Sequence, residues 1–165
     1  MDLEDLIARD HAELDKGIEA LSAWSPTAGQ RVILDETRLG FVAHAEAISN
    51  VLHAALVHVP RTHLASRLLT ATLAAHAEQE ALLWRLARNV PNTVEWTETL
   101  TTLRTCTAAH HHDEPIGLLP LVRELLDGEA YAGFATRYAT ERLRALAMMS
   151  AVVARTRAKR GSAQV

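Results

Sequence analysis

Residues 3–21 read LEDLIARDHAELDKGIEAL, and one face of this segment decides the class of fold. Apolar residues recur on that face at steps of three and four, which is the period of an amphipathic α-helix. The positions on the face are Leu3, Ile7, His11, Leu14, Ile18 and Leu21. A histidine therefore stands where a bundle helix would otherwise carry a leucine.

Three later segments repeat this pattern, each with one histidine inside its apolar stripe. The four histidines are His11, His44, His76 and His110. Glutamates follow two of them by four residues, at Glu80 and Glu114, so each shares the helix face of its histidine. Imidazole and carboxylate groups that converge inside a helical bundle are typical of a non-haem iron site.

Proline, glycine and capping residues divide the chain into five expected helices. These run from about residue 2 to 24, 30 to 59, 62 to 90, 92 to 127 and 129 to 158, with a tail at 159–165. We predict one all-α domain over residues 1–165. Its first four helices form an antiparallel up-down-up-down bundle over residues 2–126, and the extra C-terminal helix packs on it. Pro115 lacks a backbone donor and should bend the fourth helix beside Glu114.

The depth of the histidines in this bundle provides a second test. Two antiparallel helices bring residues to one level when both residues lie equally far from the turn between them. At the rise of an α-helix, the four histidines lie roughly 20–27 Å from the turns that join their helices. The spacing thus predicts four imidazoles at one level, within about one helical turn.

Composition excludes several other classes of protein. The chain has 165 residues, 48% hydrophobic and 4% aromatic, with a net charge of −3. This charge offers no basic surface for nucleic acid, and no apolar run is long enough for a membrane. The acidic start shows no signal peptide, so we expect a cytoplasmic protein. The single cysteine, Cys106, allows neither an internal disulfide nor a thiolate metal site.

Four motifs in order resemble those of the hemerythrin-like, or HHE cation-binding, family. They are Asp10-His11-x-x-Leu14, FVAHAEAISNVLHAAL from Phe41, HAEQEALLWRL from His76 and HHHDEPIGLLPLV from His110. The resemblance covers roughly residues 3–122 and implies an oxo- or hydroxo-bridged di-iron centre, held by histidines of four helices and by bridging carboxylates. Manganese and zinc are alternative metals. By position it assigns as ligands His11, His44, His76, His110 and Glu114.

The chain departs from that family at two positions. Ile48 stands where the family usually has a bridging glutamate, and Glu80 stands where its oxygen carriers have a further histidine. We take Glu80 as a sixth ligand that restores part of the lost negative charge. An open site with oxygen ligands favours activation of O2 or peroxide. We therefore expect a di-iron oxidoreductase that uses O2 or peroxide, with a small organic substrate as one option.

Two other functions fit the same residues. The chain could bind or sense O2, NO or iron without turnover, or it could be a degenerate bundle in which Ile48 marks the loss of one metal or both. The sequence makes no prediction of oligomeric state. Of the neighbouring polar side chains, either His111 or His112 could assist the ligands. Asp10 is expected at the surface, and Tyr138 is expected as a packing aromatic unless the last helix crosses the site.

Overall fold

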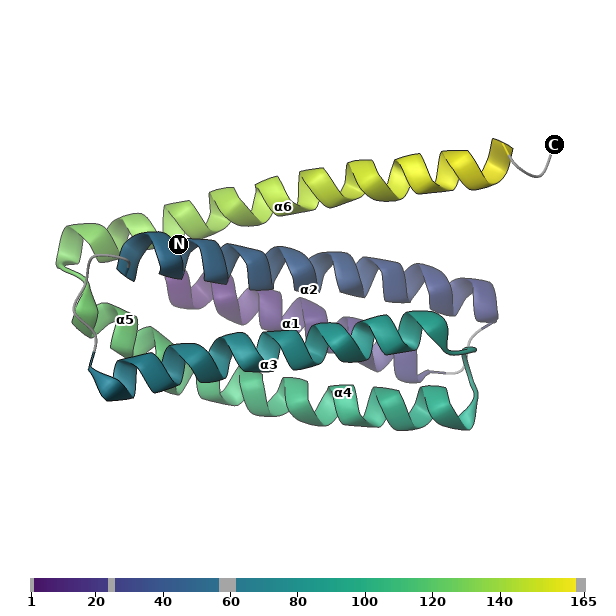
Figure 1. Ribbon diagram of the computed structural model, residues 1–165, viewed down its shortest axis with the longest axis horizontal. Coiled ribbons are helices and arrows are strands. Elements are labelled where there is room, and N and C mark those ends of the chain that lie inside the picture. The colour runs from purple at the N-terminus through teal and green to yellow at the C-terminus, as the bar shows by residue number, and fades with distance from the viewer. Residues whose placement is uncertain (1, 24–25, 57–61, 163–165) are drawn as a thin grey trace.

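A computed structural model describes residues 2–23, 26–56 and 62–162, with side chains described up to residue 151. The helices are α1 (Leu3–Ser22), α2 (Thr27–Leu56), α3 (His63–Arg88), α4 (Val94–Asp113), the π-helix η1 (Glu114–Leu118), α5 (Leu119–Leu125) and α6 (Gly128–Ser162). The described residues contain no strand, which confirms the all-α prediction (Figure 1). None of the described helices is long and apolar enough to span a bilayer.

The helices begin close to where their capping residues predict. Asp2, Thr62 and Thr93 are the N-caps of α1, α3 and α4, and each side chain accepts a hydrogen bond from the backbone N–H three residues later. The predicted helix ends near residues 24 and 59 lie outside the described residues. The predicted boundary at 158 is wrong, because α6 continues to Ser162.

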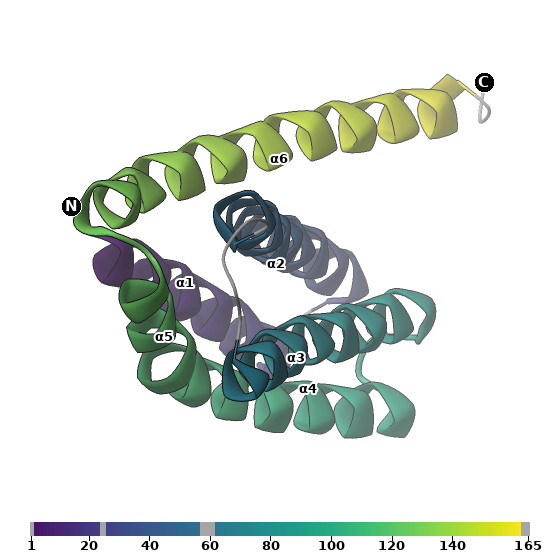
Figure 2. The same ribbon diagram turned by 60° about the vertical axis from the view of Figure 1, so that its left-hand side comes forward.

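The first four helices run alternately up and down, and α6 packs on α2 and α1 (Figure 1). Its first half lies against the bundle, whereas its C-terminal end points away from α3 and α4 (Figure 2). The chain thus has the bundle and the extra helix that its apolar stripes predict.

Two apolar clusters fill the bundle on either side of the histidine level. Toward one end, a cluster from α1, α2, α3, η1, α5 and α6 includes Ile7, Ile48 and Phe134. Toward the other end, a cluster from α1 to α4 includes Leu14 and Trp96. The histidines therefore lie between two apolar layers, where water is excluded and charges interact strongly.

Candidate metal centre

The four predicted histidines meet in the middle of the bundle, one from each of α1 to α4. Their side chains belong to residues that are 1–6% exposed, namely His11, His44, His76 and His110. Neighbouring imidazole rings have centroids 4.5–6.4 Å apart. The structure therefore brings these residues to one level, as the helix lengths predict.

Glu114, the first residue of η1, joins this group and is 1% exposed. Its Oε2 lies 2.8 Å from Nε2 of His11, 3.6 Å from Nε2 of His44 and 3.7 Å from Nε2 of His110. One ligand atom from each of these four residues lies within 4.8 Å of the others. Ligands about 2 Å from a shared ion lie at most roughly 4 Å apart, so a small contraction would let the four atoms hold one cation.

His76 is not part of this group of four, but it lies next to it and offers one more donor. Its Nε2 lies 2.9 Å from Nε2 of His110, on the α3 side of the group. In the metal-free protein one of these two nitrogens carries the proton that the other accepts. A bound cation would replace that proton, so His76 is the fifth candidate ligand.

Unpaired polar atoms at the cluster fit a cation site. Among the described residues, three buried atoms of the cluster lack a hydrogen-bond partner, namely Oε1 of Glu114, Nε2 of His44 and Nδ1 of His76. A buried donor or acceptor without a partner costs about 1–3 kcal/mol. A cation bound to Glu114 and to Nε2 of His44 would remove the first two of these costs.

Three members of the cluster, His76, His110 and Glu114, have the protonation state of metal ligands. Burial lowers the pKa of His76 to about 3 and that of His110 to about 4, so both imidazoles are neutral at pH 7. Burial opposes ionisation of Glu114, but the hydrogen bond from His11 and the positive charge of His44 hold its pKa well below the usual value. Neutral imidazoles and an ionised carboxylate are the forms that bind metal ions.

His44 carries the compensating positive charge in the metal-free protein. Burial alone would lower the pKa of His44, but Asp10 and Glu114 raise it to about 9. A cation entering the cluster would displace the proton from Nε2 of His44 and take over its charge. The site is therefore built for a positive charge at this point.

Asp10, Tyr138 and Arg142 form a buried polar chain behind His44. The Tyr138 hydroxyl lies 2.8 Å from Nδ1 of His44 and donates to Oδ2 of Asp10 at 2.5 Å. Because the phenolic proton goes to Asp10, the hydroxyl accepts from Nδ1–H of His44, which leaves Nε2 facing the cluster. Arg142 donates to the same carboxylate at 2.5 Å. Such partners fix the tautomer and orientation of a ligating imidazole.

The prediction that Asp10 lies at the surface is therefore wrong. Asp10 is 1% exposed because α6 crosses α1 and covers it. The prediction for Tyr138 named this exception, since the last helix does cross the site. The polar chain behind His44 could have been found from one signal in the sequence. An acidic residue comes directly before a candidate ligand, and a tyrosine and an arginine lie one turn apart in the last helix.

His111 also packs on the cluster, whereas His112 is exposed. The His111 ring stacks on His11, with centroids 3.8 Å apart and planes 9° apart. Its Nδ1 lies 3.1 Å from a carboxylate oxygen of Asp15. Of the two histidines that follow His110, the first thus helps to hold His11 in place.

The prediction that Glu80 faces the site is wrong. Glu80 is exposed, and its carboxylate accepts a hydrogen bond from Trp84 Nε1 at 3.4 Å. Gln79 takes the inward position instead and donates to Thr107 Oγ1 at 3.3 Å. Seen along the helix axis, the third residue after His76 lies about 60° to one side of the His76 side chain. The fourth residue lies about 40° to the other side. A small rotation of α3 therefore decides which of them faces inward.

Ile48 occupies the inward position one turn after His44. It is fully buried in the apolar cluster with Ile7 and Leu118. An apolar side chain therefore stands where the hemerythrin-like family usually has a bridging carboxylate. Among the described residues, the metal-ligand group contains one carboxylate, that of Glu114.

The expected bend at Pro115 takes the form of a single π-turn. Because proline has no backbone N–H, the α-helical pattern is interrupted, and Leu119 N–H bonds to the carbonyl of Glu114. The wider turn directly follows the candidate ligand. It also allows both Leu118 and Leu119 to be buried.

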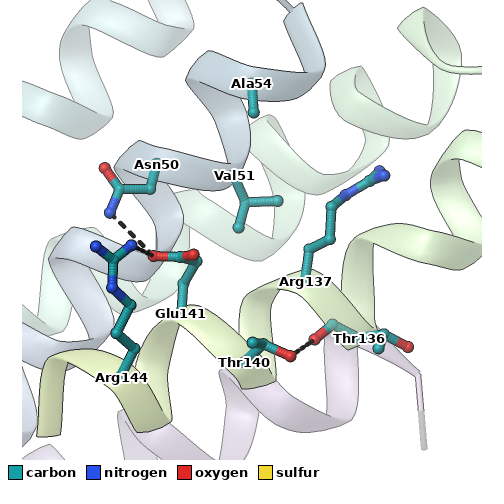
Figure 3. Close-up of a pocket in the computed structure, with 8 residues that line it drawn as sticks. All are labelled: Asn50, Val51, Ala54, Thr136, Arg137, Thr140, Glu141 and Arg144. Carbon is teal, nitrogen blue, oxygen red and sulfur yellow. Dashed lines mark hydrogen bonds and ion pairs between the residues drawn. The ribbon is translucent and has the colours of Figure 1, made fainter. Parts of the chain in front are cut away.

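Two pockets differ in their relation to this cluster. A groove of about 500 Å³ between α3 and the segment formed by α4 and η1 is lined by His110 and Glu114. A pocket of about 480 Å³ between α2 and α6 has a polar wall of Asn50, Glu141 and Arg144 and touches none of the candidate ligands (Figure 3). The first pocket is therefore the one relevant to access.

Comparisons of the chain with protein-family models, with curated proteins and with solved structures found no match. The function is therefore inferred from the geometry of the cluster.

Proposed function

We propose that this chain is a non-haem metal protein of hemerythrin-like type that binds iron and reacts with O2 or peroxide. The observation that carries the proposal is the position of Glu114, whose Oε2 faces Nε2 atoms of His11, His44 and His110. A buried carboxylate against three imidazoles, with further polar atoms unpaired, supports a cation site at this point. The motifs that resemble the hemerythrin-like family support the same proposal.

The donor set favours a particular range of metals. Imidazole and carboxylate suit iron, zinc and manganese, whereas the absence of thiolate from the cluster disfavours sites built for softer ions. Four imidazoles and one carboxylate would leave one position open on a six-coordinate iron. When bound, such an iron supplies the capacity to bind and reduce O2 or peroxide.

The number of ions follows from the number of donors. With Ile48 in place of one carboxylate and Glu80 at the surface, five protein donors remain. Five donors are enough for one ion but leave two ions mostly coordinated by solvent. We therefore propose one iron for each chain, and the di-iron centre implied by the resemblance is the alternative.

The chain's own residues set the conditions for reaction. Tyr138 and Asp10 orient His44, the two apolar clusters exclude water, and the groove beside Glu114 admits small molecules. These features support an oxidoreductase. A second candidate function is reversible binding of O2 or NO. It is favoured by the exposed position of Glu80, because without Glu80 as a ligand the set contains a single carboxylate.

The test is anaerobic loading of the metal-free protein with Fe(II), Zn(II) or Mn(II), each alone. Elemental analysis then gives the number of ions for each chain, and the optical spectrum is followed after addition of air or peroxide. We expect one iron for each chain. With ascorbate added as the electron donor, we expect consumption of many equivalents of oxidant, whereas without a donor the iron is oxidised once. Two irons would support the di-iron alternative, and a single reversible spectral change would support the binder. Equal metal content in wild type and Glu114→Gln would refute the metal site, with Glu80→Gln as the matched control.

A further inference from the structure

The groove beside the cluster has an apolar body that ends at the candidate ligands. It runs between α3 and the segment formed by α4 and η1, and His110 and Glu114 are part of its lining. Most of the remaining wall is apolar, formed by Leu68, Ala71, Ala75, Ala109, Ile116 and Leu118. Small side chains on the facing helices leave the space open, since two alanines on α3 face one on α4.

The groove also carries an uncompensated negative charge. Glu78 and Asp113 line it and are exposed, and neither forms a hydrogen bond or ion pair with any described residue. The lining contains no lysine or arginine. Burial and the charge of Glu78 raise the pKa of the Cys106 thiol, which lies in the same wall. The field of this carboxylate therefore extends along the groove.

A third carboxylate belongs to the inner part of the groove. Glu114 is 1% exposed and among the lining residues, and its Oε1 has no hydrogen-bond partner. An acidic rim, an apolar wall and a buried carboxylate oxygen together disfavour an organic anion. The acidic rim and the apolar wall favour a molecule with an apolar body and a positive charge at its outer end.

We propose that the groove binds a small organic cation with an apolar body, such as a protonated alkyl- or arylamine. Its ammonium group lies between Glu78 and Asp113, and its hydrocarbon part lies along Ala75 and Ala109 toward His110. This inference rests on the proposed function in one respect: the organic cation is a substrate only if the neighbouring cluster binds a reactive metal. Binding itself depends only on residues of the groove.

The test compares three probes of one size, namely hexylammonium, hexanol and hexanoate, by calorimetry on the metal-free and the metal-loaded protein. We expect hexylammonium to bind at least about threefold more tightly than hexanol, since two exposed carboxylates each contribute modestly. Hexanoate should bind most weakly, and the preference should shrink at high salt. In Glu78→Gln/Asp113→Asn the preference should vanish while hexanol affinity stays unchanged. Glu98→Gln, a carboxylate on α4 outside the groove, should retain the preference.

A steric variant checks the location. Ala75→Phe should abolish binding of hexylammonium and hexanol alike, whereas Ala54→Phe, in the pocket of Figure 3, should not. Equal affinities for hexylammonium and hexanol, or binding that survives Ala75→Phe, would overturn the inference. Its failure is separate from failure of the metal site. Wild type that holds metal but shows no preference refutes only the groove, and wild type without metal refutes the proposed function while the metal-free titration still tests the groove.

Discussion

The same short motif, histidine followed four residues later by glutamate, has opposite outcomes in α3 and α4. In α4, Glu114 is buried against three imidazoles, whereas in α3 Glu80 is exposed and contacts Trp84. Both histidines face the same cluster, and their Nε2 atoms lie 2.9 Å apart. The spacing of a motif thus limits a side chain to one sector of a helix, and its neighbours decide whether it faces inward.

The neighbours differ in a physical way. In α3 the regular helix continues beyond Glu80, and the amide of Gln79 finds a partner in Thr107 on α4. In the second motif α4 ends at Asp113, and Glu114 begins the π-turn that contains Pro115 and places Leu118 in the core. Packing after the motif therefore holds Glu114 inside.

The largest expected effect is on metal affinity, when the glutamate of each motif is replaced in turn. Glu114→Gln should lower metal affinity by at least about 100-fold, because the ion loses its anionic ligand in a site of low dielectric. Glu80→Gln should bind as wild type does. In the same assay His110→Ala should lose metal, whereas His53→Ala and His63→Ala, at exposed positions, should not. Elemental analysis after dialysis measures this, and similar losses at both glutamates would contradict the assignment by helix face.

Acid should destabilise the metal-free protein through the two histidines of these motifs. Their pKa values, about 3 for His76 and about 4 for His110, lie below the unfolded value of 6.5. Below pH 6.5 the unfolded chain therefore binds protons that the folded chain does not, and stability falls as the pH decreases. Between pH 7 and pH 5 each histidine should remove about 2 kcal/mol.

His44 acts in the opposite direction. Its pKa of about 9 in the folded protein is above the unfolded value, so its contribution is fully present below pH 6.5 and is lost as the pH rises through 9. Urea unfolding of the metal-free protein between pH 5 and pH 10 should thus show highest stability near neutrality. A variant without the exposed His53 and His63 should follow the same curve, and a flat curve from pH 7 to pH 5 would contradict the neutral state of His76 and His110.

The polar chain on α6 should have a smaller effect than a ligand. Tyr138→Phe removes the acceptor for Nδ1–H of His44 but leaves the ring in place, and we expect metal affinity to fall by about tenfold, as for other partners of ligating histidines. Tyr131→Phe, which removes a hydroxyl bonded to Glu4, is the control. Titration with Zn(II) or Co(II) against a chelating dye measures both. An unchanged affinity in Tyr138→Phe would show that packing alone orients His44.

A carboxylate introduced at Ile48 would make α2 resemble α4, with glutamate one turn after the histidine. Ile48 is fully buried, so in the metal-free protein Ile48→Glu should be destabilising. With metal we expect content equal to wild type or up to twofold higher, and lower turnover with peroxide because the added ligand fills the open position. Ile48→Gln is the control for size. Loss of metal or faster turnover in Ile48→Glu would favour the binder or the degenerate bundle.

The sequence predicts the parts of this molecule that depend on one helix at a time. The stripe through His11 and the common level of the histidines follow from helical period and rise. The caps at Asp2 and Thr93 follow from side-chain oxygens that accept a hydrogen bond from the first turn of a helix. That Gln79 faces inward in place of Glu80 depends on the rotation of α3 about its axis relative to α4, which the helical period alone does not fix. The burial of Asp10 depends on where α6 crosses, because no residue near Asp10 in the chain covers it.

The polar chain behind His44 also has a consequence for biosynthesis. The hydrogen bond between Tyr138 and Asp10 joins residues 128 positions apart in the chain. A ribosome therefore delivers all four imidazoles and Glu114 before it delivers the group that orients His44. A nascent chain that has emerged only as far as α5 carries the complete donor set with Asp10 still uncovered. Docking of α6 is thus the step that covers Asp10 and gives Nδ1 of His44 its partner.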